Sequence, residues 1–540
     1  MSTAKTTPSA RGTAAGLVLL TLASGQFLMT LDSSVMNVSI ATVAKDVGTT
    51  VTGIQGAITA YTLVMAALMI TGAKVGAIIG RKRAFAIGCV IYGCGSFTTA
   101  IAPNLAVLLF GWSVLEGVGA ALILPAIVAL VAGNFPAERR PGAYGLVAAA
   151  GAIAIAVGPL IGGFCTTYFS WRWVFAGEVV IVLVILLLTR RIADAPVEER
   201  PQLDVIGAIL SALGLGLLVF GVLRSSEWGW IQPKDGGPSW VGLSPTVWLV
   251  LGGFFVIWVF FRWQASRESQ GSEPLVRVAM FRNRQLTGGL TMFFFQYLVQ
   301  AGFFFVVPLY LSVALGLSAV ETGARLLPLS VTLLVAAIGI PRFLPRVSPR
   351  RVVRYGLLAL LAGTVVLLGA LDVDAGPEIV FVPLLLIGLG IGALASQLGA
   401  VTVSAVPDDE SPEVGGLQNT MTNLGASLGT ALAGSLLIAT MTSSFLINVE
   451  QSPAIPPAIT QQAEVELAGG VPFVSDADLE AALDERQVAP ESTKATLDAY
   501  ADARVAGLRS ALAILALLAI VALFLTGTIP SRPPGAAKRR

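Results

Sequence analysis

Three acidic residues interrupt stretches of sequence that are otherwise apolar. Asp32 stands in TLDSSVMNVSI, Glu116 in LLFGWSVLEGVGAALILP and Glu178 in WRWVFAGEVVIVLV. A carboxylate at the centre of a membrane costs about 2.5–3.5 kcal/mol on insertion scales, so it normally faces a cavity or a partner, where it can carry protons or attract cations. We therefore predict that all three are proton-coupling residues. Asp32 could instead join two helices by a hydrogen bond, and Glu178, a turn or two from the outer surface, could be an interfacial carboxylate reached by water.

Uncharged polar and aromatic residues accompany these acids. The segment TGGLTMFFFQYLVQAGFFFVVPLY places Gln296 and Gln300 one helical turn apart beside Tyr297. An aromatic wall with few hydrogen-bonding groups suits flat, apolar, cationic ligands, although most of these phenylalanines are equally typical of a surface that faces lipid. The residues that we expect to bind a substrate are Asp32, Asn37, Tyr61, Glu116, Gln296, Tyr297, Gln300 and Asn423.

Small residues recur at four-residue spacing in GLVAAAGAIAIAVGPLIGG, which contains Pro159. Such spacing lets helices approach closely, and a proline frees one backbone carbonyl and permits a kink. The pattern indicates either simple helix packing or a hinge. The residues that we assign to hinges or gates, here and in the loop sequence GAKVGAIIGRKR, are Gly72, Gly80, Arg81, Lys82, Gly151, Gly158, Pro159, Gly162 and Gly163.

The composition requires a bilayer around most of the chain. Of 540 residues, 55% are hydrophobic and 12% charged, whereas about a quarter are charged in soluble domains. Apolar stretches of about 20 residues, enough to cross a membrane, recur along the length. The first is too long and is followed by too many others to be a cleaved signal peptide. The expected spans lie near 14–40, 53–73, 84–102, 105–132, 143–166, 172–190, 205–224, 246–262, 287–311, 322–341, 352–371, 378–401, 412–440 and 505–527.

These spans divide the chain into two blocks of six separated by two extra helices. An Arg pair recurs in GAKVGAIIGRKRAFAIG and PRFLPRVSPRRVVRYG, and two related halves with a binding site between them are a common transporter plan. The expected parts are an N-terminal segment 1–13, a six-helix bundle 14–190, two extra helices with their loops 191–286, a second six-helix bundle 287–527 that includes an outer loop 441–503, and a basic tail 528–540.

The location of the cations predicts the orientation. Basic clusters fall in every second loop and at the C-terminal tail, although the net charge is only +2. By the positive-inside rule these loops and both termini face the cytoplasm. We expect the protein to lie in the cytoplasmic membrane of the cell. The outer loop is acidic and could screen cations, or could be a solvated loop. Within it we expect a helix capped by Ser475, and another that runs from Pro490 into the last span.

The sequence lacks the residues that metal binding, enzyme catalysis, nucleic-acid binding or nucleotide use would require. Histidine is absent, and Cys89, Cys94 and Cys165 lack metal-type spacing, so we expect no metal and no cofactor. No nucleophile with a base is visible, so we expect no enzyme activity, and the basic clusters lack the features of a nucleic-acid site. The sequence contains no GxxxxGK[ST] motif, the pattern that would indicate a nucleotide-binding site. An ion gradient remains as the energy source: a proton crossing 100 mV yields about 2.3 kcal/mol, and each pH unit adds about 1.4 kcal/mol.

Taken together, these motifs resemble those of the fourteen-span drug:proton antiporters of the major facilitator superfamily. The resemblance covers roughly residues 14–440 and the last span, and is carried by LDSSVMNV, GAKVGAIIGRKR, WSVLEGVGAA, GPLIGG and WRWVF. It implies an all-α polytopic membrane protein with the major facilitator fold, two six-helix bundles plus two extra helices (14 transmembrane helices). It also implies alternating access and export of drug-like compounds in exchange for protons.

The sequence departs from that family's pattern at charged positions. The acid and base usual in the loop motif fall on Ala77 and Ile78, so the usual charge contact cannot form there. The family's span-four arginine falls on Ser113, its glutamine on Glu116, and an asparagine after WRWVF on Glu178. Because that arginine is commonly linked to proton transfer, we hypothesise that Glu116 takes part in coupling in its place, together with Asp32.

The sequence is best interpreted as a monomeric proton-coupled antiporter that exports amphipathic, cationic, drug-like compounds. Its partners would be the small-molecule substrate, protons and the lipid bilayer. One alternative is an exporter of a dedicated cell-envelope lipid or endogenous metabolite; a phosphorylated substrate would need a basic cavity, whereas the expected cavity is acidic. Another is a non-transporting sensor or scaffold, for which a sizeable soluble domain would be expected.

Overall fold

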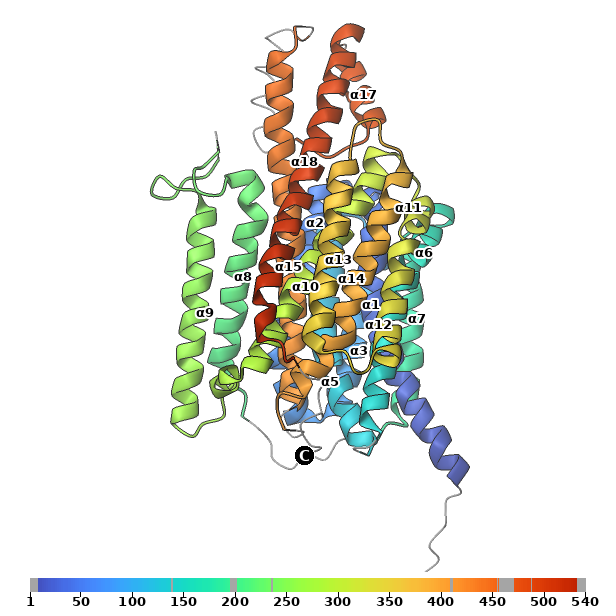
Figure 1. Ribbon diagram of the computed structural model, residues 1–540, viewed down its shortest axis with the longest axis vertical. Helices are drawn as coiled ribbons and strands as arrows, with labels where there is room; N and C mark the ends of the chain where they lie inside the picture. The colour runs from blue at the N-terminus through green and yellow to red at the C-terminus, as the bar shows by residue number, and fades with distance from the viewer. Residues whose placement is uncertain are drawn as a thin grey trace, which may run out of the picture.

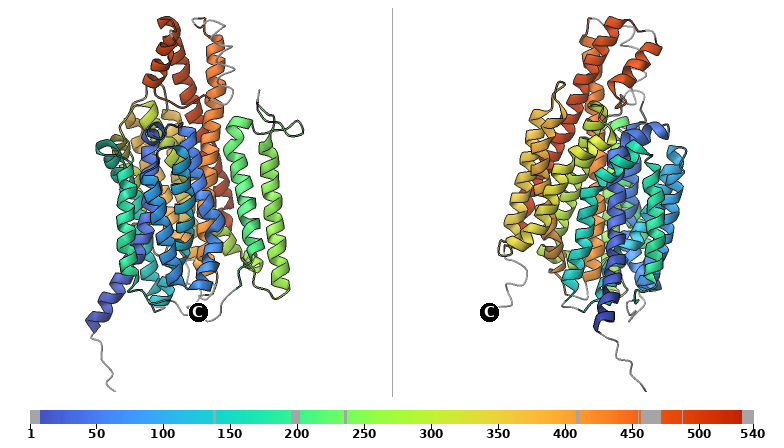
Figure 2. Two further views of the ribbon diagram at one scale, coloured as in Figure 1. Left: turned by 180° about the vertical axis from the view of Figure 1, so that it is seen from behind. Right: turned by 90° about the vertical axis from the view of Figure 1, so that its right-hand side faces the viewer.

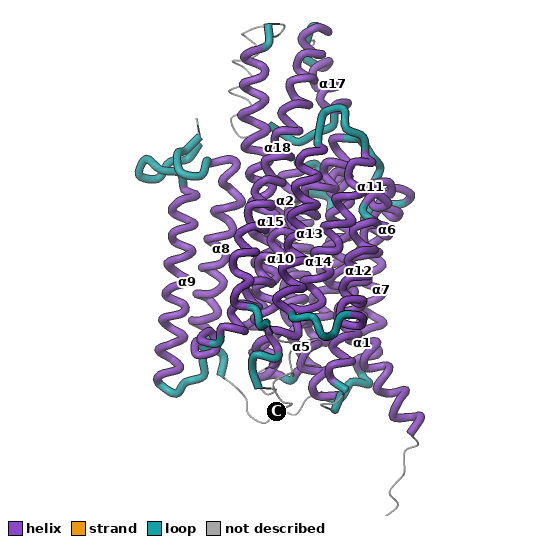
Figure 3. The backbone as a smooth tube through the Cα atoms, viewed as in Figure 1, coloured by secondary structure: helices purple, strands orange, loops and turns teal. Residues whose placement is uncertain are grey.

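The structure is a computed structural model that describes residues 8–136, 139–194, 202–234, 237–407, 411–453, 455, 471–486 and 488–531. Within these ranges the chain forms helices joined by short loops, and no β-sheet is present (Figure 3). The first helical residues and the last described residues lie at the same end of the molecule (Figure 1). The two described ends of the chain therefore share one side, as the alternation of basic loops predicts.

The first group of helices comprises α1 (Pro8–Asp46), α2 (Val51–Ile79), α3 (Arg81–Ala100), α4 (Leu105–Leu108), the π-helix η1 (Leu109–Glu116), α5 (Gly117–Asn134), α6 (Arg140–Tyr168) and α7 (Arg172–Thr189). Two further helices are α8 (Val205–Trp228) and α9 (Pro245–Ser269), followed by η2 (Val278–Arg282). The second group comprises α10 (Arg284–Leu309), η3 (Tyr310–Ala314), α11 (Ala319–Arg325), α12 (Leu327–Phe343), α13 (Pro349–Ala370), η4 (Pro377–Val380), α14 (Phe381–Val403), α15 (Ser411–Gln451), α17 (Asp476–Glu485), α18 (Pro490–Leu525) and η6 (Thr526–Thr528).

Each expected span coincides with a helix or a joined pair of helices. Among the described residues, 12 helices are long and apolar enough to cross a membrane, and α11 and α12 form one more bent pair with an angle of 42°. The remaining expected span corresponds to α3, which begins with three consecutive basic residues and packs between α5 and α7. The all-helical membrane fold is confirmed, whereas the count of fourteen spans stays a prediction.

The two groups of helices lie side by side, which is clearest in the right-hand view of Figure 2. They meet where α2 packs on α15, where α6 packs on α11 and α12, and where α1 touches α10. At the second of these contacts the backbones almost touch, because a side chain on Gly163 would collide with the carbonyl of Ala319, and one on Gly323 with the carbonyl of Pro159. The halves are thus joined by helix faces that carry little side-chain bulk.

The extra helices α8 and α9 stand to one side of the bundle (Figure 1). α8 contacts both α2 and α15, so it touches both halves. At its start the buried carboxylate of Asp204 accepts hydrogen bonds from the backbone N–H of Gly207 (3.0 Å), from Trp263 (3.1 Å) and from Gln264 (2.8 Å). Burial alone would raise the pKa of Asp204, but these donors outweigh it and hold the pKa below its ordinary value. Asp204 therefore fastens the start of α8 to the end of α9.

Beyond the bundle, α15 and α18 extend past the other helices and carry α17 beside them (Figure 1). Ser475 caps α17 by accepting a hydrogen bond from the N–H of Asp478, and α18 begins at Pro490, so both expected helix starts are confirmed. α15 continues to Gln451 with its far end packed on α18, so the first part of the expected outer loop 441–503 is helical. Residues 1–7, 456–470 and 532–540 of the expected terminal segments and outer loop lie outside the described residues.

We expect Asp204→Asn to loosen the α8–α9 pair, because the amide can accept fewer of the hydrogen bonds that the carboxylate accepts. The free energy of unfolding should fall by about 1–3 kcal/mol, the usual cost of an unsatisfied buried group. The check is the midpoint of thermal unfolding of the purified protein, with Asp374→Asn as the control because Asp374 is exposed. Equal midpoints for the two variants would contradict the assignment.

Candidate functional site

Three helices of the first half bring the three predicted acids together. Asp32 comes from α1, Glu116 from the last residue of η1 and Glu178 from α7, and one carboxylate oxygen of each lies within 4.8 Å of the others. Their exposed fractions are 0%, 0% and 1%. We call these three residues the acid cluster. The sequence identified its members individually, and the structure shows that they share one site.

Close helix packing explains why distant segments converge here. α3 lies against both η1 and α7, and Gly95 of α3 meets Gly111 of η1 without intervening side chains. A Cβ atom on Gly95 would lie 2.6 Å from the Cγ of Glu116, and one on Gly111 would lie 2.8 Å from the Oγ1 of Thr99. The π-helix that ends at Glu116 is itself a rare form that is frequently found at functional sites.

Asp32 is held by an aromatic neighbour. The indole Nε1–H of Trp112 lies 2.9 Å from both carboxylate oxygens of Asp32 and donates a hydrogen bond to them. The ring of Trp112 stacks on Tyr61, with centroids 5.2 Å apart and planes inclined by 15°. The sequence analysis missed Trp112, because a tryptophan in an apolar run is typical of ordinary packing.

Glu116 and Glu178 accept hydrogen bonds from hydroxyl groups of α3. Tyr92 (3.2 Å) and Ser96 (3.1 Å) donate to the Oε2 of Glu178, and Thr99 donates to the Oε1 of Glu116 (3.3 Å). The other oxygens, Oε2 of Glu116 and Oε1 of Glu178, are buried and have no hydrogen-bond partner among the described residues. The alternative of an interfacial carboxylate reached by water does not fit Glu178, which is 1% exposed and accepts hydrogen bonds from Tyr92 and Ser96.

The acid cluster contains three acids and no base. None of the ion pairs between described residues includes any of its members. Two full negative charges 4.8 Å apart repel each other by about 3.5 kcal/mol at an effective dielectric constant of 20. Full ionisation of all three groups is therefore strongly opposed, so the site must hold protons or another cation.

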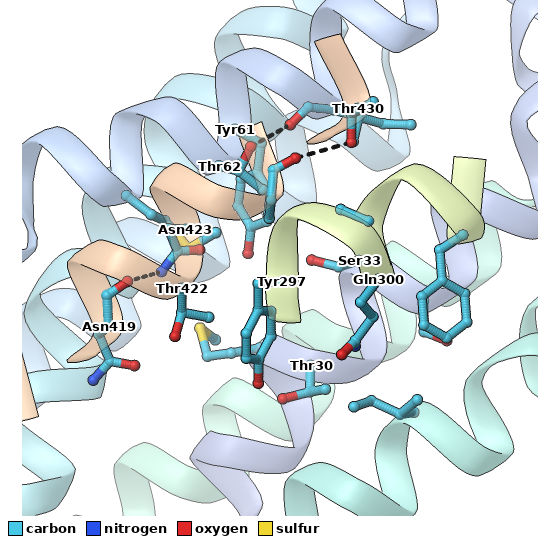
Figure 4. A pocket seen from close by; sticks show the side chains of 18 of the residues that line it. Thr30, Ser33, Tyr61, Thr62, Tyr297, Gln300, Asn419, Thr422, Asn423 and Thr430 are labelled. Carbon is cyan, nitrogen blue, oxygen red and sulfur yellow. Dashed lines mark hydrogen bonds between the residues drawn. The ribbon is translucent and has the colours of Figure 1, made fainter. Parts of the chain in front are cut away.

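A cavity of about 260 Å³ lies between the two halves, next to the acid cluster. Figure 4 shows side chains that line it, with the amide of Asn423 bonded to the carbonyl of Asn419. The lining combines polar, aromatic and aliphatic side chains and carries no charged one, so the acidic cavity expected from the sequence is in fact neutral. The lining residues are Gln26, Met29, Thr30, Ser33, Ser34, Asn37, Ile58, Tyr61, Thr62, Met65, Trp112, Leu124, Ile155, Phe293, Tyr297, Gln300, Ala301, Phe304, Gln418, Asn419, Thr422, Asn423, Ala426 and Thr430.

The structure divides the residues expected to bind substrate into two sets. Those that line the cavity are Asn37, Tyr61, Tyr297, Gln300 and Asn423. Asp32, Glu116 and Gln296 are buried but lie outside the lining. Asp32 does not line the cavity because Trp112 lies between its carboxylate and the cavity. Binding by any of these residues stays a prediction.

The loop between α2 and α3 is held by an acid that the sequence analysis missed. Asp194, which follows α7, accepts a hydrogen bond from the backbone N–H of Lys82 (2.9 Å) and lies against Gly80, whose φ is +101°. Arg81 donates to the carbonyl of Ala73 (2.5 Å), and the ammonium of Lys82 donates to the carbonyl of Arg190 (3.3 Å). Asp194 therefore supplies a polar contact at the junction of α2 and α3. Ala77 and Ile78, which stand at the usual charged positions, lie in the last turn of α2 rather than in a loop.

The other expected hinge residues lie at close helix contacts. Side chains on Gly158 and Gly162 would collide with Ser34 and Val35 of α1, and one on Gly72 with the carbonyl of Ala121. Gly151 also faces α1, near Gln26 and Thr30, and Pro159 lies inside α6. Their packing role follows from these contacts, whereas hinge motion stays a prediction.

These features define a class of protein. A bundle of membrane-crossing helices in two halves, with a cavity between them and ionisable groups beside it, is the arrangement of a membrane transporter. The chain belongs to the Major Facilitator Superfamily, whose sequence pattern matches residues 22–430. This confirms the resemblance found in the motifs and agrees with the expectation of a transporter rather than an enzyme.

Similar proteins include resistance and export proteins. The chain is 29% identical over 425 residues to the tetracenomycin C resistance and export protein of Streptomyces glaucescens, covering 78% of this chain and 75% of that protein. It is 32% identical over 446 residues to the puromycin resistance protein pur8 of Streptomyces alboniger, covering 81% and 84%. Over 460 residues it is 25% identical to the multidrug resistance protein Stp of Mycobacterium tuberculosis, covering 84% and 81%.

Solved structures show the same fold at low sequence identity. A bacterial homologue of the human lysosomal transporter Spinster, in an inward-facing and unoccupied conformation, superposes with a TM-score of 0.60 at 15% identity, covering 96% of this chain and 98% of that one. The peptide transporter POT in complex with sulfate gives a TM-score of 0.55 at 15% identity, covering 95% of each chain. These likenesses establish the arrangement of the helices.

We expect Gly95→Ala to push α3 away from η1 and to disrupt the acid cluster. The added methyl group would lie 2.7 Å from the carbonyl of Gly111 as well as against Glu116, and such overpacking costs about 1–3 kcal/mol. Gly177→Ala is the matched control, because it lies next to Glu178 in α7 but its added methyl group meets nothing within 4 Å. The midpoint of thermal unfolding should fall for the first variant alone, and a similar fall for both would refute this packing argument.

Proposed function

We propose that this transporter is a proton-coupled antiporter that exports amphipathic, cationic, drug-like compounds across the cytoplasmic membrane by alternating access. The observation that carries the proposal is the position of Trp112. Its ring lines the cavity, and its Nε1–H donates to Asp32 of the acid cluster. One side chain therefore touches both the space for a substrate and the groups that would carry protons.

Coupling follows from this shared side chain. A substrate that displaces the ring of Trp112 would also remove the hydrogen-bond donor of Asp32, since both belong to one rigid indole. The loss of a donor makes the charged form of a buried carboxylate less stable, so occupancy of the cavity changes the number of protons that the cluster holds. Conversely, protonation of Asp32 weakens the bond that holds the ring in place. Substrate and proton would thus influence each other reciprocally.

The cavity supports an aromatic substrate with a few polar groups. Tyr61, Trp112, Tyr297 and Phe304 provide aromatic surface, and Gln300 provides an amide. Aromatic faces attract cations, and the acid cluster adds negative charge behind the Tyr61–Trp112 pair. The names of the relatives, which refer to tetracenomycin C and puromycin, support antibiotic-like compounds as the class.

Alternating access requires contacts that can break on one side of the cavity. The amide of Gln55 donates to the carbonyl of Thr430 (3.1 Å), and Ser427 donates to the carbonyl of Thr59 (2.9 Å), so α2 and α15 are joined by few hydrogen bonds. On the other flank, the N–H of Val320 donates to Thr167 across α6 and α11 (3.1 Å). These sparse polar contacts between the halves are compatible with rocking. The basic loops support an orientation with both termini in the cytoplasm.

A second candidate substrate is a neutral endogenous metabolite. The uncharged lining favours it, because a permanently cationic ligand would find no charged partner among the side chains that it touches. One similar protein is named a probable actinorhodin transporter, from Streptomyces coelicolor. Competition between cationic and neutral aromatic compounds for the same transport would distinguish the two.

We expect substrate-triggered proton flux in liposomes that contain the purified protein and carry an imposed pH gradient. Asp32→Asn and Glu116→Gln should each lower this flux at least about tenfold, because each removes a proton-carrying group from the cluster. Glu450→Gln, an exposed position at the far end of α15, should leave it unchanged. If both cluster variants retain coupled flux, the proton carriers are assigned wrongly, and if no compound in a broad panel triggers flux, the multidrug proposal fails.

We expect Trp112→Phe to separate binding from coupling. The phenyl ring still fills most of the space, but it has no N–H for Asp32, and a hydrogen bond to a charged group contributes about 1.5–3 kcal/mol, or at least a tenfold effect. Coupled flux should therefore fall at least about tenfold while substrate affinity, measured by quenching of tryptophan fluorescence, changes less. Trp258→Phe, on the exposed face of α9, is the control. Equal losses of affinity and flux would mean that Trp112 serves only to bind.

A further inference from the structure

The acid cluster contains oxygen atoms that no protein group uses. Oε2 of Glu116, Oε1 of Glu178 and the hydroxyl of Tyr61 are all buried and have no hydrogen-bond partner among the described residues. Tyr61 comes from α2, is 1% exposed and lies nearest to Asp32 among the three carboxylates. Buried polar atoms in native proteins nearly always have a partner, and a bound ion is one recognised partner where the protein supplies none.

The carboxylate oxygens are spaced for one shared ion. They all lie within 4.8 Å of one another, and the centre of an equilateral triangle of that side is about 2.8 Å from each corner, or less when the triangle is smaller, which approaches the 2.3–2.6 Å of protein oxygens around Ca²⁺. A single ion could therefore touch a carboxylate from α1, η1 and α7 at the same time. Longer separations would permit only pairwise contacts.

The donor set selects a hard cation. The possible ligand atoms are all oxygens: the carboxylates of Asp32, Glu116 and Glu178 and the hydroxyl of Tyr61. The indole N–H of Trp112 donates to Asp32, and Tyr92 supports the cluster from α3. Oxygen ligands suit hard ions such as alkali and alkaline-earth cations rather than softer transition metals. The cation would also offset negative charge that no Lys or Arg among the described residues balances.

The number of free oxygens favours a monovalent ion. Ca²⁺ takes six to eight oxygen ligands, and Mg²⁺ usually retains several waters. The sealed cluster offers fewer free oxygens than Ca²⁺ requires, and its members are at most 1% exposed, which leaves little access for retained waters. Na⁺ carries less charge, loses its water more readily and accepts fewer ligands. We propose that Asp32, Glu116, Glu178 and Tyr61 form a binding site for Na⁺.

This site is distinct from the substrate cavity, because Tyr61 and Trp112 separate the carboxylates from it. The sequence analysis predicted no metal, since the acids are far apart in the chain and lack a metal-type spacing. Binding of Na⁺ is independent of transport, whereas its use as a second coupling ion rests on the proposed function. Tyr61 touches both spaces, so movement of its ring would open a path between them.

The test is the thermal unfolding of the purified full-length protein during a titration with NaCl, with choline chloride keeping the ionic strength constant. A ligand that binds only the folded state raises the unfolding midpoint with its concentration. We expect a rise of about 3 °C or more at saturation, with none in choline alone. Glu116→Gln and Glu178→Gln should each lose most of the rise, and Glu480→Gln, which is exposed on α17, should keep it.

Tyr61→Phe provides a milder variant, because it removes one hydroxyl and leaves all three carboxylates. It should raise the Na⁺ concentration needed for half of the effect about tenfold, and it decides the matter if the glutamate variants do not fold. The proposal is overturned if Na⁺ and choline act alike on the wild-type protein, if Ca²⁺ alone stabilises it, or if the folded variants respond as the wild type does. Proton flux without Na⁺ stabilisation refutes only this inference, and Na⁺ stabilisation without substrate-triggered flux refutes only the proposed function.

Discussion

The cost of placing three carboxylates together inside a membrane governs the architecture of the first half. No base among the described residues neutralises Asp32, Glu116 and Glu178, so their stability depends on hydrogen-bond donors and on bound protons or cations. α3 supplies hydroxyl donors, and its glycine-lined contact with η1 brings Glu116 within reach of them. The packing of α1, η1, α3 and α7 is thus the means by which an unfavourable cluster of charge is kept in place.

A consequence is that the carboxylates and the cavity are separated by one aromatic layer. The cavity is neutral because the indole of Trp112 and the ring of Tyr61 lie between it and the carboxylates. In a low-dielectric interior, charges act over a longer range than in water, so the cluster influences a bound compound without touching it. Such a site can accept compounds of varied shape through aromatic contacts while the charge remains sealed from solvent. This separation distinguishes the cavity from one lined directly by acids.

Hydropathy and charge predicted the helices and the members of the cluster, because both signals are local. Asp32 and Glu116 are conspicuous in apolar runs, and the family resemblance supplied the fold. Contacts between distant segments could not be predicted from these local signals. Glu178 was judged by its distance along a helix, whereas α3 determines its burial. Trp112 and Asp194 were missed because an aromatic residue in a span and an acid in a loop are both common, and only the packing of other helices gives them a role.

The two halves contribute different chemistry to the same space. All members of the acid cluster belong to α1, η1 and α7, whereas the side chains that α10 and α15 present to the cavity are uncharged. Tyr297 and Gln300 therefore face the aromatic pair across the boundary between the halves. Any rotation of one half against the other must change the distance between these groups and Trp112, because the helices that carry them belong to different bundles. A motion that exposes the cavity to the other side would in this way also alter the surroundings of Asp32, so the proposed alternating access and ion binding would be linked by geometry.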